Sequence, residues 1–234
     1  MLRALLILAF WGVGAVPAGL FGIVWTFLSG KVDLLYRMGI NVAWAGVRLV
    51  GVKVEVVGSE KLDWRRTYIF MCNHVSNLDP PIVIPMMPRR TSVLVKKELF
   101  KVPILGWGMR LARLVPVDRQ NRETAIASLH YAADVLRSGL NMTIWPEGTR
   151  SPDGRLQPFK KGPFHLAMDS GVPVVPITLV GTYEIWPKGR FAVRPGTATV
   201  IFHEPIDPKA YASPDELLDA VRERIRSGLP EKYQ

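Results

Sequence analysis

Cysteine is nearly absent from this sequence, because Cys72 is the only one among 234 residues. A single cysteine excludes an intramolecular disulfide and a zinc site built from several cysteines. Cys72 ends the apolar run that begins at Tyr68. We therefore expect a buried core thiol in a protein of a reducing compartment.

Charged side chains are missing from residues 4–30, although they make up 21% of the whole chain. This apolar segment matches the roughly 20 residues needed to cross a bilayer. A cleaved signal peptide is the alternative, but the run exceeds the usual length of about 7 to 15 residues and lacks an Ala-x-Ala site, so we expect it to be retained. The residues that interrupt it predict two short helices or one kinked helix: Gly12, Gly14, Pro17, Gly19 and Gly22.

Residues 31–50 are amphipathic, with apolar side chains at an approximate helical spacing and basic residues between them. This pattern predicts a helix that either lies along a lipid surface or packs on the rest of the protein. If the first segment spans a membrane, the positive-inside bias places the remainder in the cytoplasm, at the inner (cytoplasmic) membrane. The basic residues that carry this prediction are Lys31, Arg37, Arg48 and Lys53.

The net charge of +10 suits a surface that faces phosphates, either of nucleic acid or of anionic lipid. The apolar N-terminus favours a membrane with anionic lipids, because an apolar anchor and a basic surface reinforce each other there. The sequence contains no helix-turn-helix, zinc or RNA-recognition signature, so we expect no nucleic-acid partner.

Beyond residue 50, short apolar runs alternate with helical patterns, which predicts an α/β domain in which helices cover a mixed β-sheet. One helix should start at Asn121, carry Ile126, Leu129, Ala133 and Leu136 on one stripe and stop at Gly139. A capping box at 213–216 should start a last helix, with Leu217, Leu218, Val221 and Ile225 on its apolar face. The expected strands are Val52–Val57, Tyr68–Cys72, Ser92–Val95, Leu114–Val117, Met142–Trp145, Val172–Thr178 and Ala198–Phe202.

No internal repeat, low-complexity tract or long linker divides this part of the sequence. The only boundary that we expect lies near residue 50. The sequence therefore predicts membrane-associating helices over residues 1–50 and one catalytic domain over residues 51–234.

His74 directly follows an apolar strand, and Asp79 lies five positions later, just before Pro80 at the expected start of a helix. A carboxylate at this place can accept one imidazole N–H, which leaves the other ring nitrogen free to take a proton. Such a pair is a general base for a hydroxyl nucleophile, worth about 10² to 10⁴ in rate. Simple hydrogen bonding within a loop is the alternative interpretation.

A second polar cluster, Glu147-Gly148-Thr149-Arg150, also follows a strand. Loops at strand ends form ligand crevices in α/β sheets. Arg150 could bind a phosphate bidentately, while Glu147 could orient a polar substrate group or hold Arg150 in place. A surface turn with a Glu/Arg pair is the alternative.

Together these clusters resemble the PlsC-type glycerolipid acyltransferases, the 1-acylglycerol-3-phosphate acyltransferase family with four ordered sequence blocks. The resemblance covers roughly residues 50 to 207, and the first and third blocks are the most specific. The blocks correspond to Asn73-His74-x4-Asp79, Gly108 through Val117-Asp118-Arg119, Pro146-Glu147-Gly148-Thr149-Arg150 and Val175-Pro176-Ile177.

The resemblance implies an O-acyltransferase in which His74 deprotonates the sn-2 hydroxyl of lysophosphatidate. This hydroxyl then attacks an acyl thioester directly, and Asp79 orients His74. The glycerol phosphate would be bound by Arg119, Glu147, Gly148, Thr149 and Arg150. The thioester could come from acyl-CoA or from an acyl carrier protein. We expect no metal and no redox cofactor.

Three alternatives remain at this point. A serine hydrolase using Ser76 lacks a Gly-x-Ser-x-Gly elbow. Another acceptor, glycerol-3-phosphate or a different lysolipid, would use the same blocks. A non-catalytic lipid-binding protein would need no general base at His74. His130, His165 and His203 lack a clear catalytic partner, so we expect them to be structural.

Overall fold

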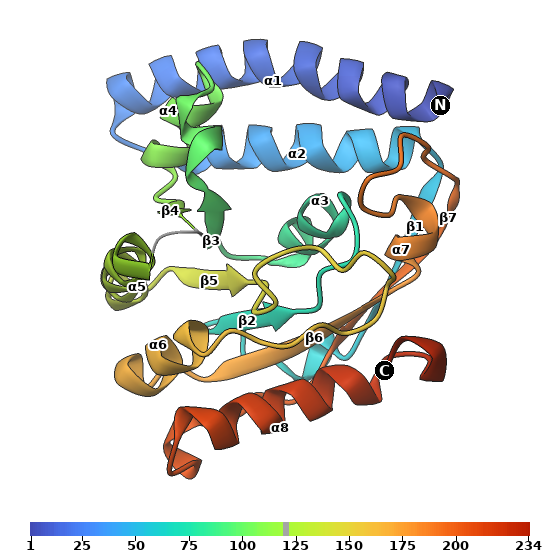
Figure 1. Ribbon diagram of the computed structural model, residues 1–234. Coiled ribbons are helices and arrows are strands. Elements are labelled where there is room, and N and C mark those ends of the chain that lie inside the picture. The colour runs from blue at the N-terminus through green and yellow to red at the C-terminus, as the bar shows by residue number, and fades with distance from the viewer. Residues whose placement is uncertain (119–121) are drawn as a thin grey trace.

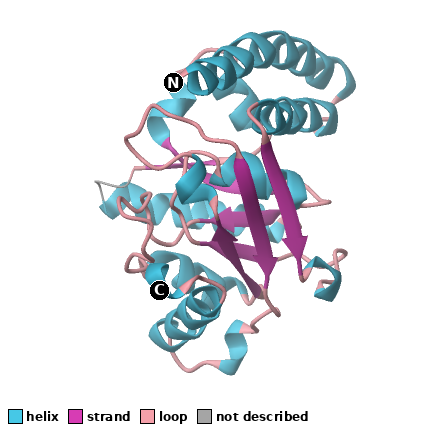
Figure 2. Ribbon diagram, turned by 90° about the vertical axis from the view of Figure 1, so that its right-hand side faces the viewer, coloured by secondary structure: helices cyan, strands magenta, loops and turns pink. Residues whose placement is uncertain are grey.

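The computed structural model describes residues 1–118 and 122–234 as a seven-stranded sheet with helices on both faces (Figures 1 and 2). The predicted α/β class is confirmed, and every predicted strand coincides with an observed one to within a few residues. The strands are β1 (Val52–Val57), β2 (Ile69–Cys72), β3 (Thr91–Lys96), β4 (Val115–Val117), β5 (Asn141–Ile144), β6 (Val174–Val180) and β7 (Gly196–Phe202).

The sheet has the strand order β1-β7-β6-β2-β5-β3-β4 and is mixed. Only β6 and β7 pair antiparallel, while the other neighbours run parallel. The central strand β2 lies between β5 and β6. Because β2 and β5 are parallel neighbours, the loops that follow them meet at one edge of the sheet.

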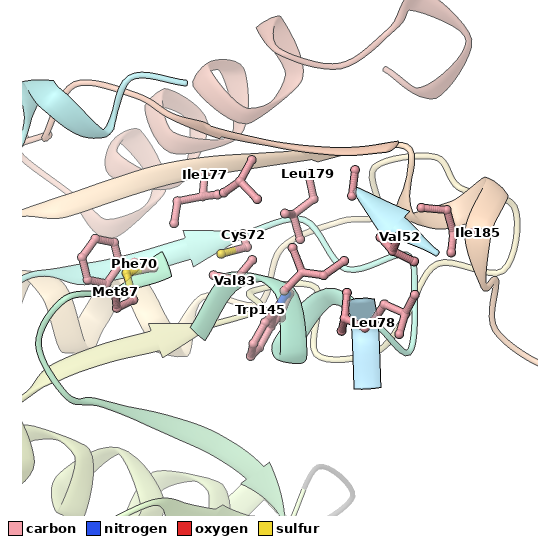
Figure 3. Close-up of a cluster of buried hydrophobic side chains, with 14 of the residues drawn as sticks. Val52, Phe70, Cys72, Leu78, Val83, Met87, Trp145, Ile177, Leu179 and Ile185 are labelled. Atoms are coloured by element: carbon pink, nitrogen blue, oxygen red, sulfur yellow. The ribbon is translucent and has the colours of Figure 1, made fainter. Parts of the chain in front are cut away.

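Each face of the sheet is covered by its own set of helices. On β2, Phe70 and Cys72 face the cluster shared with α1, α2 and α3 (Figure 3), whereas Ile69 and Met71 face α5, α6 and α8. Cys72 is fully buried, which confirms the predicted core thiol. The helices are α1 (Leu2–Ser29), α2 (Asp33–Leu49), α3 (Asp79–Val83), α4 (Leu105–Leu111), α5 (Arg122–Arg137), α6 (Gly162–Ser170), α7 (Thr182–Ile185) and α8 (Pro214–Ser227).

The N-terminal segment forms one continuous helix of 28 residues, so the prediction of two separate helices is wrong. Two of its glycines, Gly14 and Gly22, lie close against α2. A Cβ atom at Gly22 would lie 2.8 Å from the Cα atom of Leu35. Within the described residues α1 is the one helix long and apolar enough to cross a membrane, and most of its apolar side chains are exposed.

Helix α2 packs on the domain, between α1 and α3 (Figure 1). Packing on the rest of the protein is one of the two arrangements predicted for this segment. The hydroxyl of Tyr36 fixes α2 to the start of β3, because it accepts a hydrogen bond from the backbone N–H of Thr91 at 3.0 Å. The aromatic ring of Trp11 extends from α1 and donates its indole N–H to the carbonyl of Ala43.

The other two predicted helices are present, with changes in detail. Among the described residues of α5, Leu136 is buried and Leu129 and Ala133 pack partly buried against the core as predicted, whereas Ile126 is exposed, so the predicted stripe was partly wrong. Asn121, its expected cap, lies outside the described residues. In α8 the hydroxyl of Ser213 accepts from the N–H of Glu216 as predicted, and Leu217, Val221 and Ile225 are buried.

Candidate active site

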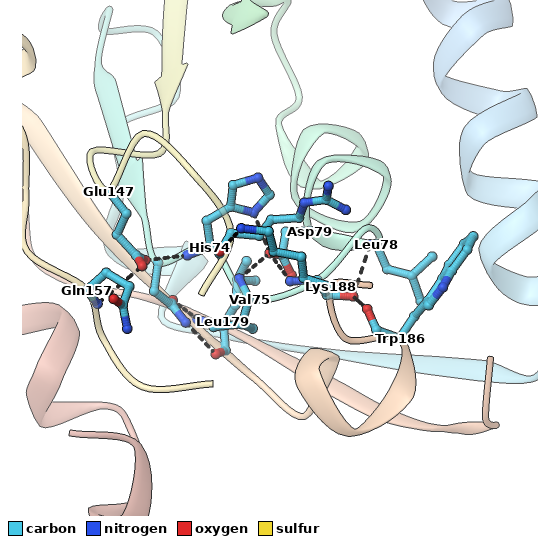
Figure 4. A network of polar contacts seen from close by, with 12 residues as sticks. His74, Val75, Leu78, Asp79, Glu147, Gln157, Leu179, Trp186 and Lys188 are labelled. Atoms are coloured by element: carbon cyan, nitrogen blue, oxygen red, sulfur yellow. Dashed lines mark hydrogen bonds and ion pairs between the residues drawn. The ribbon is translucent and has the colours of Figure 1, made fainter. Parts of the chain in front are cut away.

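His74 lies at the end of β2 and contacts Asp79 at the first turn of α3 (Figure 4). The distance from Nδ1 of His74 to Oδ2 of Asp79 is 2.7 Å. The same oxygen accepts the backbone N–H groups of Val75 and Ser76, at 2.7 and 2.8 Å. An ionised carboxylate has acceptors only, so Nδ1 of His74 carries the proton and Nε2 is left as an acceptor.

Asp79 is fully buried and His74 is 9% exposed. The ring of His74 lies 5.1 Å from the ring of Trp145, which limits its movement. A buried carboxylate that accepts three N–H groups is held in one orientation, and it stabilises a positive charge on the imidazole. The pair thus has the geometry of a general base with its orienting acid.

The loop that follows β5 holds the backbone of His74 from both sides. Oε1 of Glu147 accepts the N–H of His74 at 2.6 Å, and the carbonyl of His74 accepts the N–H of Ser151 at 2.7 Å. Oε2 of Glu147 accepts the N–H of Gln157 at 3.2 Å. Both carboxylate oxygens therefore contact backbone, and in the described part of the chain no ion pair joins Glu147 to Arg150.

Glu147 is only 3% exposed, and this burial raises the pKa of its carboxyl group to about 8, against the lowering effect of its two backbone hydrogen bonds. Its place behind His74 gives Glu147 a positioning function for the His74 backbone. The Glu147 side chain points into the protein. Its predicted contact with substrate stays a prediction.

The remaining residues of this loop lie nearer the surface. Gly148 has a φ of 73°, which favours glycine, and Thr149 is exposed. Nζ of Lys188 donates to Oγ1 of Thr149 at 3.3 Å and to the carbonyl of Arg150 at 3.2 Å. Lys188 thus adds a cation to the predicted phosphate-binding loop. Arg119, the predicted phosphate ligand of the second block, lies outside the described residues.

Asn73 and Ser76 fix the His74 loop to other elements. The Asn73 amide pairs with the backbone of Leu179 on β6, accepting its N–H at 2.7 Å and donating to its carbonyl at 3.0 Å. The Ser76 hydroxyl donates to the carbonyl of Trp186 at 2.7 Å and accepts the N–H of Leu78. Because this hydroxyl is buried and occupied, Ser76 has a structural role and is a poor nucleophile.

Sequence reasoning missed the roles of Ser151, Trp186 and Lys188. The last two belong to the segment after α7, far from both motifs in the sequence, and they reach the site only through the pairing of β6 with β2. No local pattern could have identified them. Asn73 did offer a signal, because it is a polar residue at the end of an entirely apolar strand.

The other candidates raised by the sequence lie elsewhere. His203 shares a hydrogen bond of 2.8 Å with Thr178, and burial lowers its pKa. His130 and His165 are exposed. Across residues 1–118 and 122–234, no group of three His, Cys, Asp or Glu side chains is placed to hold a metal ion.

Comparisons with known proteins agree on one family. The family model described as Acyltransferase matches residues 53–180. A 1-acyl-sn-glycerol-3-phosphate acyltransferase of Limnanthes alba is 39% identical over 201 residues, which cover 83% of this chain and 69% of that protein. The enzyme of the same name from Saccharomyces cerevisiae is 32% identical, with 88% and 73% covered.

A solved structure gives the same result. The crystal structure of the 1-acyl-sn-glycerophosphate (LPA) acyltransferase PlsC from Thermotoga maritima superposes with a TM-score of 0.84. The two sequences are 32% identical, and the match covers 97% of this chain and 93% of the other. The likeness therefore includes the N-terminal helices as well as the sheet.

Proposed function

The chain belongs to the 1-acyl-sn-glycerol-3-phosphate acyltransferase family, and from this premise we propose that His74 and Asp79 catalyse acyl transfer to lysophosphatidate. The product is phosphatidate. The observation that carries the proposal is the single oxygen of Asp79 that accepts Nδ1–H of His74 and two backbone N–H groups, because it leaves Nε2 as the base.

In the proposed reaction Nε2 of His74 takes the proton of the sn-2 hydroxyl as its oxygen attacks the thioester carbonyl. The tetrahedral intermediate then collapses and expels the thiolate, which receives the proton from His74. Asp79 stabilises the imidazolium between these two steps. The hydroxyl attacks directly, so no acyl-enzyme forms. Acyl-CoA and an acyl carrier protein present the same thioester, and either can serve as the donor.

Binding of the lysophosphatidate phosphate is assigned in this proposal to Gly148, Thr149 and Arg150, together with Arg119. Support comes from the position of their loop beside His74 and from Lys188, whose ammonium group contacts both Thr149 and Arg150. Guanidinium groups suit phosphate because they donate two parallel hydrogen bonds. Glu147 acts behind them, on the backbone of His74.

The exposed apolar surface of α1 indicates membrane association. The proposed location is the cytoplasmic face of the inner membrane, with α1 lying in one leaflet. Helix α2 packs along α1 and also on the catalytic domain, so α1 could not span a bilayer without drawing the charged α2 into it. The net charge of +10 supports the cytoplasmic side, because the cytoplasmic leaflet carries anionic lipids.

The test is phosphatidate formation by detergent-purified protein from lysophosphatidate and labelled acyl-CoA, repeated with acyl carrier protein as donor. Asp79→Asn is the sharpest variant, since an amide oxygen can still accept the three N–H groups while the negative charge is removed. We expect kcat to fall about 10² to 10⁴-fold for His74→Ala and for Asp79→Asn.

The control variant is Ser76→Ala, which removes one buried hydroxyl and is expected to lower stability by about 1 to 3 kcal/mol while keeping substantial transferase activity. Loss of activity with Ser76→Ala as complete as with His74→Ala would favour a serine hydrolase. If glycerol-3-phosphate gives product and lysophosphatidate does not, glycerol-3-phosphate is the acceptor. If the wild type forms no product with either donor, a non-catalytic lipid-binding protein is favoured.

A further inference from the structure

A cavity of about 560 Å³ lies beside α2, away from His74. Its walls come from α2, the segment before β3, the turn between α4 and β4, and the turn between α5 and β5. Ser138 and Leu140 line it before β5 begins, whereas Glu147 contacts His74 after β5 ends. The four residues of β5 span about 13 Å, so the cavity and the active site lie at opposite ends of this strand.

From the described part of the chain, four arginines and a single carboxylate, that of Asp33, line the cavity. Arg89 is used by the fold, because its guanidinium donates to the carbonyls of Arg65, Arg66 and Gly139, each at 2.8 Å. The other three arginines of the cavity are Arg37, Arg90 and Arg113. For Arg37 and Arg113, the described part of the chain provides no side-chain hydrogen bond and no ion pair.

Arg90 is held in place but poorly paired. Its guanidinium lies over the ring of Tyr36, 5.9 Å from the centroid, and Tyr36 is itself fixed to Thr91. Among the described residues the only carboxylate in reach is that of Asp33, at 3.4 Å, and this carboxylate is 65% exposed. Nε of Arg90 is buried without a partner among the described residues. The Arg90 side chain is 20% exposed, and a partly buried cation with an unused donor is stabilised by a ligand that pairs with it.

Arg113 has a strained backbone. Its φ is 61°, a conformation that costs a residue with a Cβ atom roughly 1 to 2 kcal/mol and that usually selects glycine or asparagine after a helix. The Ser92 hydroxyl donates to its carbonyl at 2.6 Å, which holds this conformation. An arginine at a position suited to glycine motivates the hypothesis that its guanidinium has a function there.

We propose that Arg37, Arg90 and Arg113 form a second phosphate-binding site, separate from the active site. Three guanidinium groups with few internal partners match the several acceptor oxygens of a phosphate. The site lies beside α2, about one helix diameter of 10 Å from α1. With α1 in the membrane interface, this distance is that of the lipid headgroups. An anionic lipid headgroup and a soluble phosphate ester present the same group.

The headgroup arm measures binding of the full-length protein to vesicles of phosphatidylcholine with and without phosphatidylglycerol. Arg113→Gly is the informative variant, because glycine relieves the backbone strain and keeps or raises Tm while the guanidinium is lost. We expect Arg113→Gly and Arg37→Gln each to weaken the binding to phosphatidylglycerol vesicles about fivefold, which corresponds to about 1 kcal/mol per arginine.

Arg48→Gln is the matched control, because it removes the same charge from the same helix outside the cavity. A loss with Arg48→Gln equal to that with Arg37→Gln would mean diffuse attraction and would overturn the site. The second arm titrates the detergent-solubilised protein with inorganic phosphate and follows ³¹P line broadening. Broadening that depends on Arg113, without a preference for phosphatidylglycerol, would assign the site to soluble phosphates. No dependence on Arg113 in either arm would refute the proposal.

Discussion

At the scale of single residues, the site is built from side chains that hold the backbone around His74. Asp79, Glu147 and Asn73 are all buried, and each one accepts at least one backbone N–H. The hydrogen bonds from the backbone to these buried groups fix one loop conformation, although Oδ1 of Asp79 has no partner among the described residues. The geometry of the base thus depends on residues that need not touch the substrate.

Glu147 leads to a prediction for the pH dependence of stability. Its pKa in the folded protein is raised to about 8, against an ordinary value of 4.5, so folding takes up a proton between these pH values. The stabilisation from this group is complete below pH about 4.5 and is lost as the pH rises to about 8. We therefore expect the Tm of the wild type to fall relative to the Tm of Glu147→Gln as the pH rises over this range.

Thermal unfolding of both proteins in one detergent, over a series of pH values, measures this difference and cancels the contribution of other titrating groups. Two parallel curves of Tm against pH would contradict the raised pKa. Glutamine has one acceptor oxygen, so it can serve either His74 or Gln157 but not both. Glu147→Gln should therefore also lower kcat, through a displaced His74 backbone.

Sequence patterns were sufficient for the approximate positions of the strands and for the His74–Asp79 contact, because both depend on short segments. Asp79 is near His74 in the sequence, and apolar runs mark buried strands whatever their neighbours. The sequence could not predict that the Glu147 carboxylate turns inward, because this depends on which strand lies beside β2. The sequence suggested that this glutamate orients a substrate group or holds Arg150, and its contact with the His74 backbone became visible only in the structure.

At the scale of secondary-structure elements, the helical pair α1/α2 is connected to the active site through aromatic residues. Trp11 of α1 stacks on Trp186, with 6.4 Å between ring centroids, and the carbonyl of Trp186 accepts the hydroxyl of Ser76. A change in the α1/α2 packing should therefore reach the His74 loop. The interrupting glycines suggested breaks in α1, but in the structure Gly22 and Gly46 allow two helices to lie close together.

Gly46 and Gly39 provide a matched test on the same helix. A Cβ atom at Gly46 would lie 2.1 Å from Nε1 of Trp11, whereas at Gly39 it would meet nothing within 4 Å. Gly39→Ala should raise stability by up to about 1 kcal/mol through helix propensity. Gly46→Ala should lower it by about 1 to 3 kcal/mol through overpacking, and should also reduce turnover.

Thermal unfolding and phosphatidate formation, measured on both variants in detergent, compare the two positions. Equal stabilisation by both alanines would show that Trp11 moves freely and that the α1/α2 contact is loose. Reduced turnover with Gly46→Ala but an unchanged Tm would instead place the effect on the contact between Trp11 and Trp186.

At the scale of the whole molecule, the exposed apolar surface of α1 determines how the protein meets a membrane. Leu20, Phe21 and Val24 are each more than half exposed, and their neighbour Phe27 packs on Trp107 of α4, with ring centroids 6.4 Å apart. The apolar surface thus continues from α1 onto the catalytic domain. A protein bound through this surface holds α2 beside the membrane, because α2 packs along α1.

Replacing Leu20, Phe21 and Val24 together by serine should release the protein from vesicles. Each half-exposed side chain contributes about 1 kcal/mol when lipid covers it, so the triple variant should bind roughly a hundredfold more weakly.

The control is the double change Val56→Ser and Val57→Ser, at exposed apolar positions of β1, which runs away from α2 (Figure 1). Co-sedimentation with phosphatidylcholine vesicles measures both. Release by the β1 variant to the same extent would show that apolar exposure anywhere on the protein drives binding, whereas retention of the α1 variant would show that α1 is not the surface that meets the membrane.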